Sequence, residues 1–502
     1  ARLEQELDKL IRYWHGRIDA VAVETPDAEF NSMLNMWSPY NCQMTFNWSR
    51  AASLVYTAME RDGLGYRDSV QDILGVLPNI PDEAGKRLEL MITGQVSTGG
   101  AMPVVNKIAH KPGKEKLPDE NQYRSDDCLW LFNAVPAYVK ETGDINFYNK
   151  VLPYADKGED TVLGHLRRAI QFNLDRSGKH GLPCGLLADW NDCLKFGHDG
   201  ETAFVAMQLR FALKEYIQIC KMLGKSEEVE WAKPKLAQID ENIQKYVWDG
   251  KWFLRGYRVD GFKFGSNESK EGKIYLNPQA WAVISEAASA EQAKTAMQSV
   301  NEMLATEYGI ALCNPPYTYG ADYNIVRSAL FNPSMKENGA IFTHTQGWAV
   351  MAETLLGNGN RAYQYWRAYM PAAYNTRAEI RQIEPYVYNQ STHGQYSPRF
   401  GASRLPWLSG SATWSFFVAT QYILGVRPDY DGIIIDPCIP ADWKEFKVAR
   451  RFRGKQLNII VKNPCGVQKG VSKININNKT IDGCKIANSD LASNNEIVVI
   501  MG

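Results

Sequence analysis

The sequence lacks the features that mark several large classes of protein. Charge of one sign is not in excess, because 56 Lys and Arg balance 56 Asp and Glu over 502 residues. A chain without a basic excess is not expected to bind nucleic acid. No apolar run approaches the roughly 20 residues that a membrane-spanning helix needs, and the first residues do not have the pattern of a signal peptide. We therefore expect a globular protein that binds neither nucleic acid nor membranes.

Cysteine is sparse and has no metal-binding or disulfide pattern. The nine cysteines are an odd number, widely spread, and none forms a CxxC pair. This argues against a disulfide framework and against a zinc ribbon, and it fits a reducing cytoplasm. A P-loop, a dinucleotide fingerprint, HExxH and GxSxG are also absent. We expect neither a metal nor a cofactor, and a cytoplasmic location.

The hydrophobic pattern changes near Gly425. Before it, apolar residues recur at helical spacing, for example over 203–223 and in a segment expected to begin at Ser125 and end at Gly143. Long loops rich in Gly, Pro, Asn and aromatics separate these helical segments. After it, short runs of Ile and Val alternate with turn residues, which predicts a small antiparallel β module. The expected fold class is mainly α with a β module: an (α/α)6 barrel followed by a small C-terminal β-sandwich. An irregular helical bundle is the alternative. The expected domains are a helical segment (1–30), the barrel (31–425) and the β module (426–502).

Aromatic residues are abundant, with 14 Trp and 25 Tyr, and many stand beside carboxylates and amides in loops, which suggests a sugar site. The most informative segment contains Asp189 and Asp192 on either side of Trp190 and Asn191. A carboxyl group beside an aromatic wall can have its pKa raised by desolvation, so that it stays protonated and donates to a glycosidic oxygen. The alternative is that Asp189 or Asn191 caps the segment that follows.

Three further segments contain residues that could bind an anionic ligand. His344 stands at the expected start of a helix, where an anion can bind, although a lone His is more often structural. Ser409 and Gly410 open a small-residue helix that can offer hydroxyl and N–H groups, or simply pack closely against a neighbour. In the segment 61–72, arginines and acids surround two glycines. There the alternative to ligand binding is a buried ion pair between Arg67 and Asp72.

Six motifs, read in order, resemble one family across the whole chain: GYRDSVQD, YRSDDCLWL, ADWNDCL, KENGAIFTH, EPYVYNQ and WLSGSATW. They are similar to glycoside hydrolase family 94, the inverting phosphorylases of cellobiose, chitobiose, cellodextrin, laminaribiose and cellobionic acid. The resemblance implies an N-terminal β-sandwich, a helical linker, an (α/α)6 barrel and a C-terminal β module, and a homodimer. This sequence starts at the linker helix and lacks the family's sandwich, so we expect it to be part of a longer chain.

The resemblance also assigns roles to residues. Asp192, the second acid of its motif, is expected to be the general acid. The residues expected to hold the donor sugar are Arg50, Asp68, Trp190 and Gln390. Those expected to bind phosphate are Arg61, His344, Ser409 and Gly410, with Ser409 where the family usually has Thr. Lys336 matches an acceptor-site position. Arg327 falls where cellobiose phosphorylases have an acceptor-binding Glu, which would suit an acidic acceptor.

These assignments predict a reaction between a disaccharide and inorganic phosphate as small-molecule substrates. Cellobionic acid and phosphate would give α-D-glucose 1-phosphate and D-gluconate with inversion. Alternatives are a cellobiose or chitobiose phosphorylase, an inverting hydrolase with Glu384 or Glu337 as base, and a non-catalytic carbohydrate-binding protein. Phosphate is already an anionic nucleophile, so only the hydrolase needs a second carboxylate.

Overall fold

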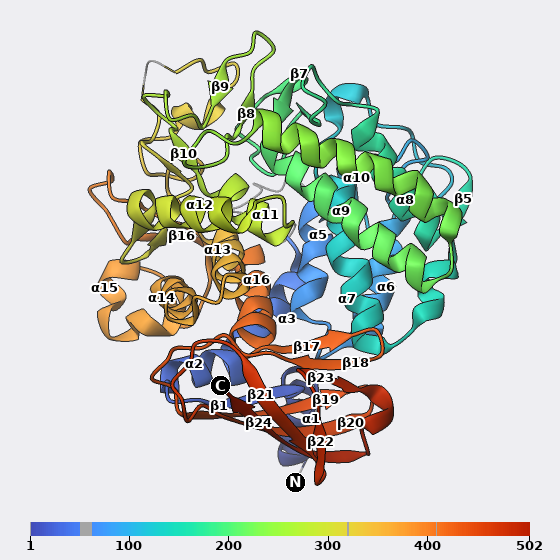
Figure 1. Cartoon of the computed structure of the whole chain (residues 1–502), viewed down its shortest axis with the longest axis vertical. Helices are drawn as coiled ribbons and strands as arrows, with labels where there is room; N and C mark the ends of the chain where they lie inside the picture. Colours follow the sequence, from blue (N-terminus) through green and yellow to red (C-terminus); the bar gives the residue numbers. More distant parts are fainter. Residues whose placement is uncertain (1, 51–62, 319–320, 408) are drawn as a thin grey trace.

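The computed structural model describes residues 2–50, 63–318, 321–407 and 409–502. Helices fill the upper part of the view in Figure 1, and strands from the C-terminal part gather at the lower end, where both termini lie. The expectation of a mainly helical chain with a β module is therefore confirmed. The principal helices are α1 (Arg2–Ile18), α2 (Ala28–Ser32), α3 (Ser38–Trp48), α5 (Tyr66–Asp72), α6 (Pro81–Ile92), α7 (Leu131–Thr142), α8 (Val162–Leu174), α9 (Ala203–Met222), α10 (Ser226–Tyr246), α11 (Leu276–Ile284), α12 (Ala290–Met303), α13 (Thr343–Leu355), α14 (Gly359–Tyr369), α15 (Ala378–Arg381) and α16 (Gly410–Val418).

The helices pack in neighbouring pairs. Helix α9 contacts α10, α11 contacts α12, and α13 contacts α14. The first members of these pairs also contact one another, since α11 touches both α9 and α13. Helix α13 in turn contacts α16, α16 contacts α5, and α7 contacts both α5 and α9. Helix α13 is buried along almost its whole length, as expected of a helix with neighbours on all sides.

Local sequence signals set several helix ends. Helix α7 ends at Gly143, whose φ of 79° is left-handed, as the sequence predicted. Helix α9 begins after Thr202, whose hydroxyl accepts a hydrogen bond from the N–H of Val205. The segment predicted to be helical from Ser125 begins instead with a 3-10 turn, Asp127–Trp130, before α7.

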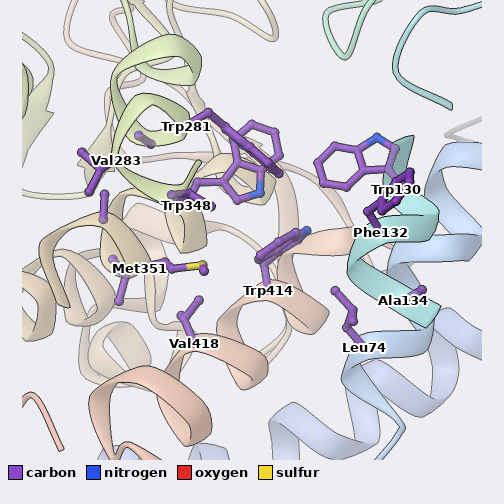
Figure 2. Close-up of a cluster of buried hydrophobic side chains, with 14 of the residues drawn as sticks. Leu74, Trp130, Phe132, Ala134, Trp281, Val283, Trp348, Met351, Trp414 and Val418 are labelled. Atoms are coloured by element: carbon purple, nitrogen blue, oxygen red, sulfur yellow. The ribbon is translucent and has the colours of Figure 1, made fainter. Parts of the chain in front are cut away.

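A cluster of tryptophans forms the core between these helices (Figure 2). The ring of Trp348 on α13 lies 5.9 Å from those of Trp130 and Trp281 and 6.0 Å from that of Trp414. All four side chains are fully buried. The Trp130 and Trp348 rings are stacked, and the other two contacts are edge to face. Large rings packed in this way leave little freedom to move, so the helices that carry them are held firmly.

The C-terminal module contains two sheets. The larger has the strand order β1 (Val21–Glu24), β19 (Glu445–Phe452), β20 (Lys455–Lys462), β24 (Asn494–Met501), β21 (Val471–Ile476) and β22 (Lys479–Ile481). The smaller has the order β17 (Val426–Asp429), β18 (Gly432–Ile435) and β23 (Lys485–Ala487). The prediction of a purely antiparallel module is wrong at one place, because β20 and β24 pair in parallel. Strand β1 belongs to residues 1–30, for which only helix was expected, and it covers the edge of β19.

Candidate functional site

The segments carrying the six motifs meet at a cavity near the N-terminal ends of α13 and α16. His344 is the second residue of α13, and Gly410 is the first of α16. The cavity is lined by Arg50, Gly65, Tyr66, Arg67, Asp68, Pro103, Arg124, Asp127, Trp190, Asp192, Glu337, Phe342, His344, Gln390, Ser409 and Gly410. The partial positive charge at the start of a helix favours anions, so this cavity combines carboxylates with an electrostatic setting that suits an anionic ligand.

Asp192 lies on the cavity wall between two arginines. Its Oδ1 atom is 3.1 Å from Nη1 of Arg67 and 3.4 Å from Nε of Arg124, and 53% of the side chain is exposed. Burial of the site opposes ionisation, but Arg67 and Arg124 outweigh it and hold the pKa of Asp192 below its ordinary value. The expectation that the aromatic wall raises the pKa of this carboxyl group is therefore wrong for the free protein.

Asp189, the other acid of the motif, is wholly buried and serves the local structure. Its two carboxylate oxygens form a bidentate ion pair with Arg255, with Nη1 to Oδ2 at 2.6 Å and Nη2 to Oδ1 at 2.7 Å. Thr202 donates to Oδ2 at 2.6 Å, and the N–H of Asn191 donates to Oδ1 at 2.8 Å. With its oxygens occupied in this way, Asp189 is poorly placed to react with a ligand.

The arginines near the cavity pair differently from the sequence expectation. Asp72 is bonded to Arg50 and not to Arg67, so that part of the prediction is wrong. Arg67 donates instead to Asp126 at 2.7 Å. It also donates to Asp192 and to the backbone carbonyl oxygens of Asp189 and Trp190. Asp126 in turn accepts from the indole N–H of Trp130 in the tryptophan core at 2.8 Å. The guanidinium beside Asp192 is thus anchored in the rigid interior.

Two further carboxyl groups in the cavity are poised to hold protons. Burial raises the pKa of Glu337 to about 7, and the charge of Asp192 adds to the effect. Glu337 Oε2 accepts from the N–H of Cys193 at 3.0 Å and from the amide of Asn191 at 3.2 Å. Burial, followed by the opposing effect of Arg124, leaves the pKa of Asp127 raised to about 7. Asp192 is therefore the most fully ionised of these three carboxyl groups near neutral pH.

His344 is buried, and its ring is held by contacts on several sides. Its Nε2 atom is 2.9 Å from Oε1 of Gln71 on α5. Trp190 packs edge to face against it, with ring centroids 5.4 Å apart. Burial and the nearby charge of Arg50 lower the pKa of His344 to about 3, so the ring is neutral near pH 7. A Cβ added at Gly410 would lie 2.6 Å from Nδ1, so this nitrogen faces the turn at the start of α16.

The residues expected to hold the donor sugar also meet at the cavity. Arg50 is buried and lies 3.6 Å from Asp68, whose side chain is partly exposed. Gln390 lies on β15 (Asn389–Thr392), and its buried Oε1 has no hydrogen-bond partner among the described residues. A buried acceptor left open in this way is the kind of group that a sugar hydroxyl can satisfy. Trp190 adds an apolar face beside them.

Three of the expected site residues are not placed in this cavity. Arg61 lies outside the described residues. Arg327 and Lys336 are not among the residues that line the cavity. Arg327 is exposed and begins a 3-10 turn, next to the bridge between Leu194 and Val326. Lys336 stands over the ring of Phe331 at 5.1 Å. Glu384, one of the two candidate bases, is also outside the cavity lining, whereas Glu337 is part of it.

Sequence reasoning missed three charged residues of the cavity. From the sequence, Arg67 is expected only in a structural ion pair, and Arg124 and Asp127 only as members of a motif. Their signal is present in the sequence, since all three stand in two of the six motifs, GYRDSVQD and YRSDDCLWL. What the sequence does not give is the fold that brings residues 67 and 124 to the same carboxylate.

Comparisons with known proteins identify a family and several relatives. The family described as "Glycosyl hydrolase 94 superfamily, catalytic domain" matches residues 13–425. The N,N'-diacetylchitobiose phosphorylase of Vibrio proteolyticus is 36% identical over all of this chain and 65% of its own length. The cellobionic acid phosphorylase of Neurospora crassa is 28% identical over 88% of this chain and 55% of its own. The chain thus spans less than two thirds of the length of these relatives.

A solved structure titled "Sialidase" has a similar fold. It superposes with a TM-score of 0.59 at 14% identity, covering 95% of this chain and 41% of its own. At that identity the likeness concerns the fold alone. Within the described ranges, every helix falls short of the length or the apolar character that a membrane crossing requires.

Proposed function

The chain belongs to the glycosyl hydrolase 94 superfamily, and from that premise we propose that it catalyses the inverting phosphorolysis of a β-linked disaccharide. The observation that carries the proposal is the convergence of Asp192 with His344 and Gly410 on one cavity. One side offers a proton donor for a glycosidic oxygen, and the other offers two helix starts that favour an anion. A single displacement by phosphate then converts a β-linkage into an α-sugar phosphate.

Asp192 is the proposed general acid, and its surroundings explain how it can gain its proton. In the free protein, Arg67 and Arg124 keep its pKa low. A phosphate anion bound beside His344 adds negative charge to the same cavity, which offsets the arginines and raises the pKa of Asp192. A proton would therefore reside on Asp192 chiefly when phosphate is present. This couples the acid to its nucleophile and disfavours cleavage by water.

The donor sugar is proposed to occupy the space between Trp190, Gln390, Asp68 and Arg50. Trp190 offers an aromatic edge and face, and the open Oε1 of Gln390 accepts from a hydroxyl. Asp68 is partly exposed on the cavity wall and can accept a further hydroxyl. Holding the sugar in this way fixes its anomeric carbon between the acid and the phosphate, and such orientation is itself a large part of catalysis.

Two disaccharides are candidates for the substrate. The first is N,N'-diacetylchitobiose, which is supported by the relative that is 36% identical. The second is cellobionic acid, supported by Lys195, a cation on which the charges of both Asp192 and Arg327 act. Arg327 lies close enough to Lys195 to contribute to the lowered pKa of that ammonium group, for which burial is the main cause. A carboxylate acceptor would pair with Arg327, whereas a neutral sugar would not.

An inverting hydrolase is the second candidate function, because Glu337 lines the same cavity as Asp192. A hydrolase would need Glu337 as an ionised base that activates water. The two hydrogen bonds that occupy the Oε2 atom of Glu337 disfavour this role. Measuring sugar release with and without phosphate separates the two reactions.

The helix contacts support a finer description of the fold. We propose that residues 31–425 form an (α/α)6 barrel with α5, α7, α9, α11, α13 and α16 as its inner helices. The contacts between successive members, and between α16 and α5, support this ring. In this description the cavity opens at the end of the barrel where α13 and α16 begin, and the C-terminal sheets lie at the other end (Figure 1).

A further inference from the structure

Gln71 accepts a hydrogen bond from each of two rings, and its orientation can be assigned from chemistry. Its side-chain oxygen lies 2.9 Å from the indole nitrogen of Trp414. An indole N–H can only donate, so the atom of Gln71 facing it must be the carbonyl oxygen. At the other end, the amide nitrogen of Gln71 lies 3.1 Å from the backbone carbonyl of Arg67, which can only accept. Both ends therefore fix the same orientation of the amide.

This orientation determines which nitrogen of His344 carries hydrogen. The Gln71 oxygen that accepts from Trp414 also lies 2.9 Å from Nε2 of His344. Because that oxygen only accepts, Nε2 must be the donor. The pKa of His344 is lowered to about 3 by burial and by Arg50, so the ring is neutral near pH 7. Its hydrogen is then on Nε2, and Nδ1 carries a lone pair.

The lone pair of Nδ1 faces the part of the cavity assigned to phosphate. Nδ1 makes no hydrogen bond with any described residue and lies beside the Gly410 turn. The charged groups around the ring are Arg50 and Arg67, which disfavour its protonation, and Asp68, which favours it. Burial and the two arginines together lower the pKa of the ring and keep it neutral. Nδ1 therefore offers a hydrogen-bond acceptor to an anion, which would ordinarily be bound by donors.

We propose that Gln71 and Trp414 hold His344 in its Nε2–H tautomer, so that phosphate binds with one P–OH group donating a hydrogen bond to Nδ1. Phosphate keeps at least one such hydrogen at neutral pH. Sulfate has the same shape but has none, so it would bring an acceptor against an acceptor. Gln71 is a positioning residue here, and the proposal rests on the proposed function only for the identity of the anion.

Trp414 connects this arrangement to the interior. It is fully buried in the tryptophan core with Trp348 and Trp130 (Figure 2). Its indole cannot turn without repacking that core, so the donor that orients Gln71 is fixed in place. The tautomer of His344 is thereby determined by packing some distance from the cavity, and not by an exposed side chain that a ligand could displace.

The tautomer can be read from the ring nitrogens of histidine-labelled protein by long-range ¹H–¹⁵N correlation. His344 is one of seven histidines, and its signals are those that disappear in His344→Asn. The proposal requires a protonated, pyrrole-like Nε2 and an unprotonated, pyridine-like Nδ1 at pH 7 in the free protein. A protonated Nδ1, or a doubly protonated ring, overturns it. This measurement does not depend on what the protein catalyses.

Calorimetric titration of the same protein with phosphate and with sulfate tests the proposed hydrogen bond from phosphate to Nδ1 of His344. Phosphate is expected to bind about tenfold more tightly than sulfate, or better, because one hydrogen bond is replaced by a repulsive contact. Equal affinities overturn the hydrogen bond to Nδ1. If phosphate does not bind at all, that part fails together with the proposed function, while the ring-nitrogen signals still decide the tautomer.

A pair of substitutions tests whether Gln71 determines the tautomer of His344. Gln71→Met keeps the length of the side chain but removes its acceptor, so a mixture of tautomers and about tenfold weaker phosphate binding are expected. Gln208→Met removes another buried glutamine, which has no hydrogen-bond partner among the described residues, and should change neither. An unchanged tautomer and unchanged phosphate affinity in folded Gln71→Met overturn the role of Gln71. If this variant does not fold, the wild-type spectrum and titrations still decide the proposal.

Discussion

Asp192 lies with its Oδ1 atom 3.1 Å from Nη1 of Arg67, so the proposed proton donor rests in an ion pair. Removing the carboxylate charge tests its role most simply. Asp192→Asn should lower kcat about 10²- to 10⁴-fold, the usual contribution of a general acid, with an unchanged circular dichroism spectrum. Near-normal turnover in a folded Asp192→Asn variant would contradict the assignment.

Asp189→Asn provides the contrast, because Asp189 is paired with Arg255 and both side chains are fully buried. Breaking one partner of a buried pair leaves the other uncompensated and typically costs about 3–5 kcal/mol. We therefore expect a loss of stability, measured by denaturant unfolding, that Asp192→Asn does not show. Equal stability of the two variants would show that Asp189 does not have the structural role described.

Arg124→Gln should change the pH dependence of turnover. Arg124 stabilises the ionised form of Asp192, so removing it raises the pKa of that carboxyl group. A general acid must be protonated, and activity falls as the pH rises through its pKa. The basic limb of the kcat–pH profile is therefore expected to move to higher pH in the variant. A shift to lower pH would mean that this limb does not report Asp192.

Glu337→Gln should alter the dependence of stability on pH. The pKa of Glu337 is raised to about 7 in the folded protein, so folding retains a proton that the unfolded chain loses above about pH 4.5. The wild type therefore loses stability from this group as the pH rises from about 4.5 through 7. The glutamine variant should be more stable than the wild type at pH 8, by roughly 3 kcal/mol, and similar at pH 4. The same difference at both values would contradict the raised pKa.

Gly410→Ala should damage phosphate binding while sparing the sugar. An added Cβ would lie 2.6 Å from Nδ1 of His344, so that ring must move, whereas Nη2 of Arg50, at 3.2 Å, would be only tightly contacted. The KM for phosphate is expected to rise about tenfold or more, with the KM for the disaccharide changing little. Gly16→Ala in α1 is the matched control, since nothing lies within 4 Å of its added Cβ. An unchanged phosphate KM in Gly410→Ala would place the anion elsewhere.

The sequence predicted local structure well, but it predicted long-range ion pairs and strand pairing poorly. Gly143 ends α7 and Thr343 begins α13 as predicted, because caps and apolar periodicity act over a few residues. The partner of Asp72 was predicted incorrectly, because the choice between Arg67 and Arg50 depends on how α5 sits against the neighbouring segments. The parallel pairing of β20 with β24 was not predicted for the same reason, since the sequences of short alternating strands do not reveal the order of the strands in the sheet.

In the candidate site, too, the sequence predicted which residues take part but not the long-range contacts that set their charge states. The types of residue and their motifs pointed to a sugar and an anion, and the structure brings eight of the proposed residues to one cavity: Arg50, Asp68, Trp190, Asp192, His344, Gln390, Ser409 and Gly410. The direction of the pKa of Asp192 could not be predicted from Trp190, its neighbour in the sequence. It is set by Arg67 and Arg124, which are distant along the chain.

The most direct test of the account is the phosphate dependence of sugar release. N,N'-diacetylchitobiose and cellobionic acid are incubated separately with the protein, with and without phosphate, and the products are followed by NMR. We expect turnover of one of them only with phosphate, giving an α-sugar 1-phosphate. Release of free reducing sugar at the same rate without phosphate would contradict phosphorolysis and favour the hydrolase with Glu337 as its base.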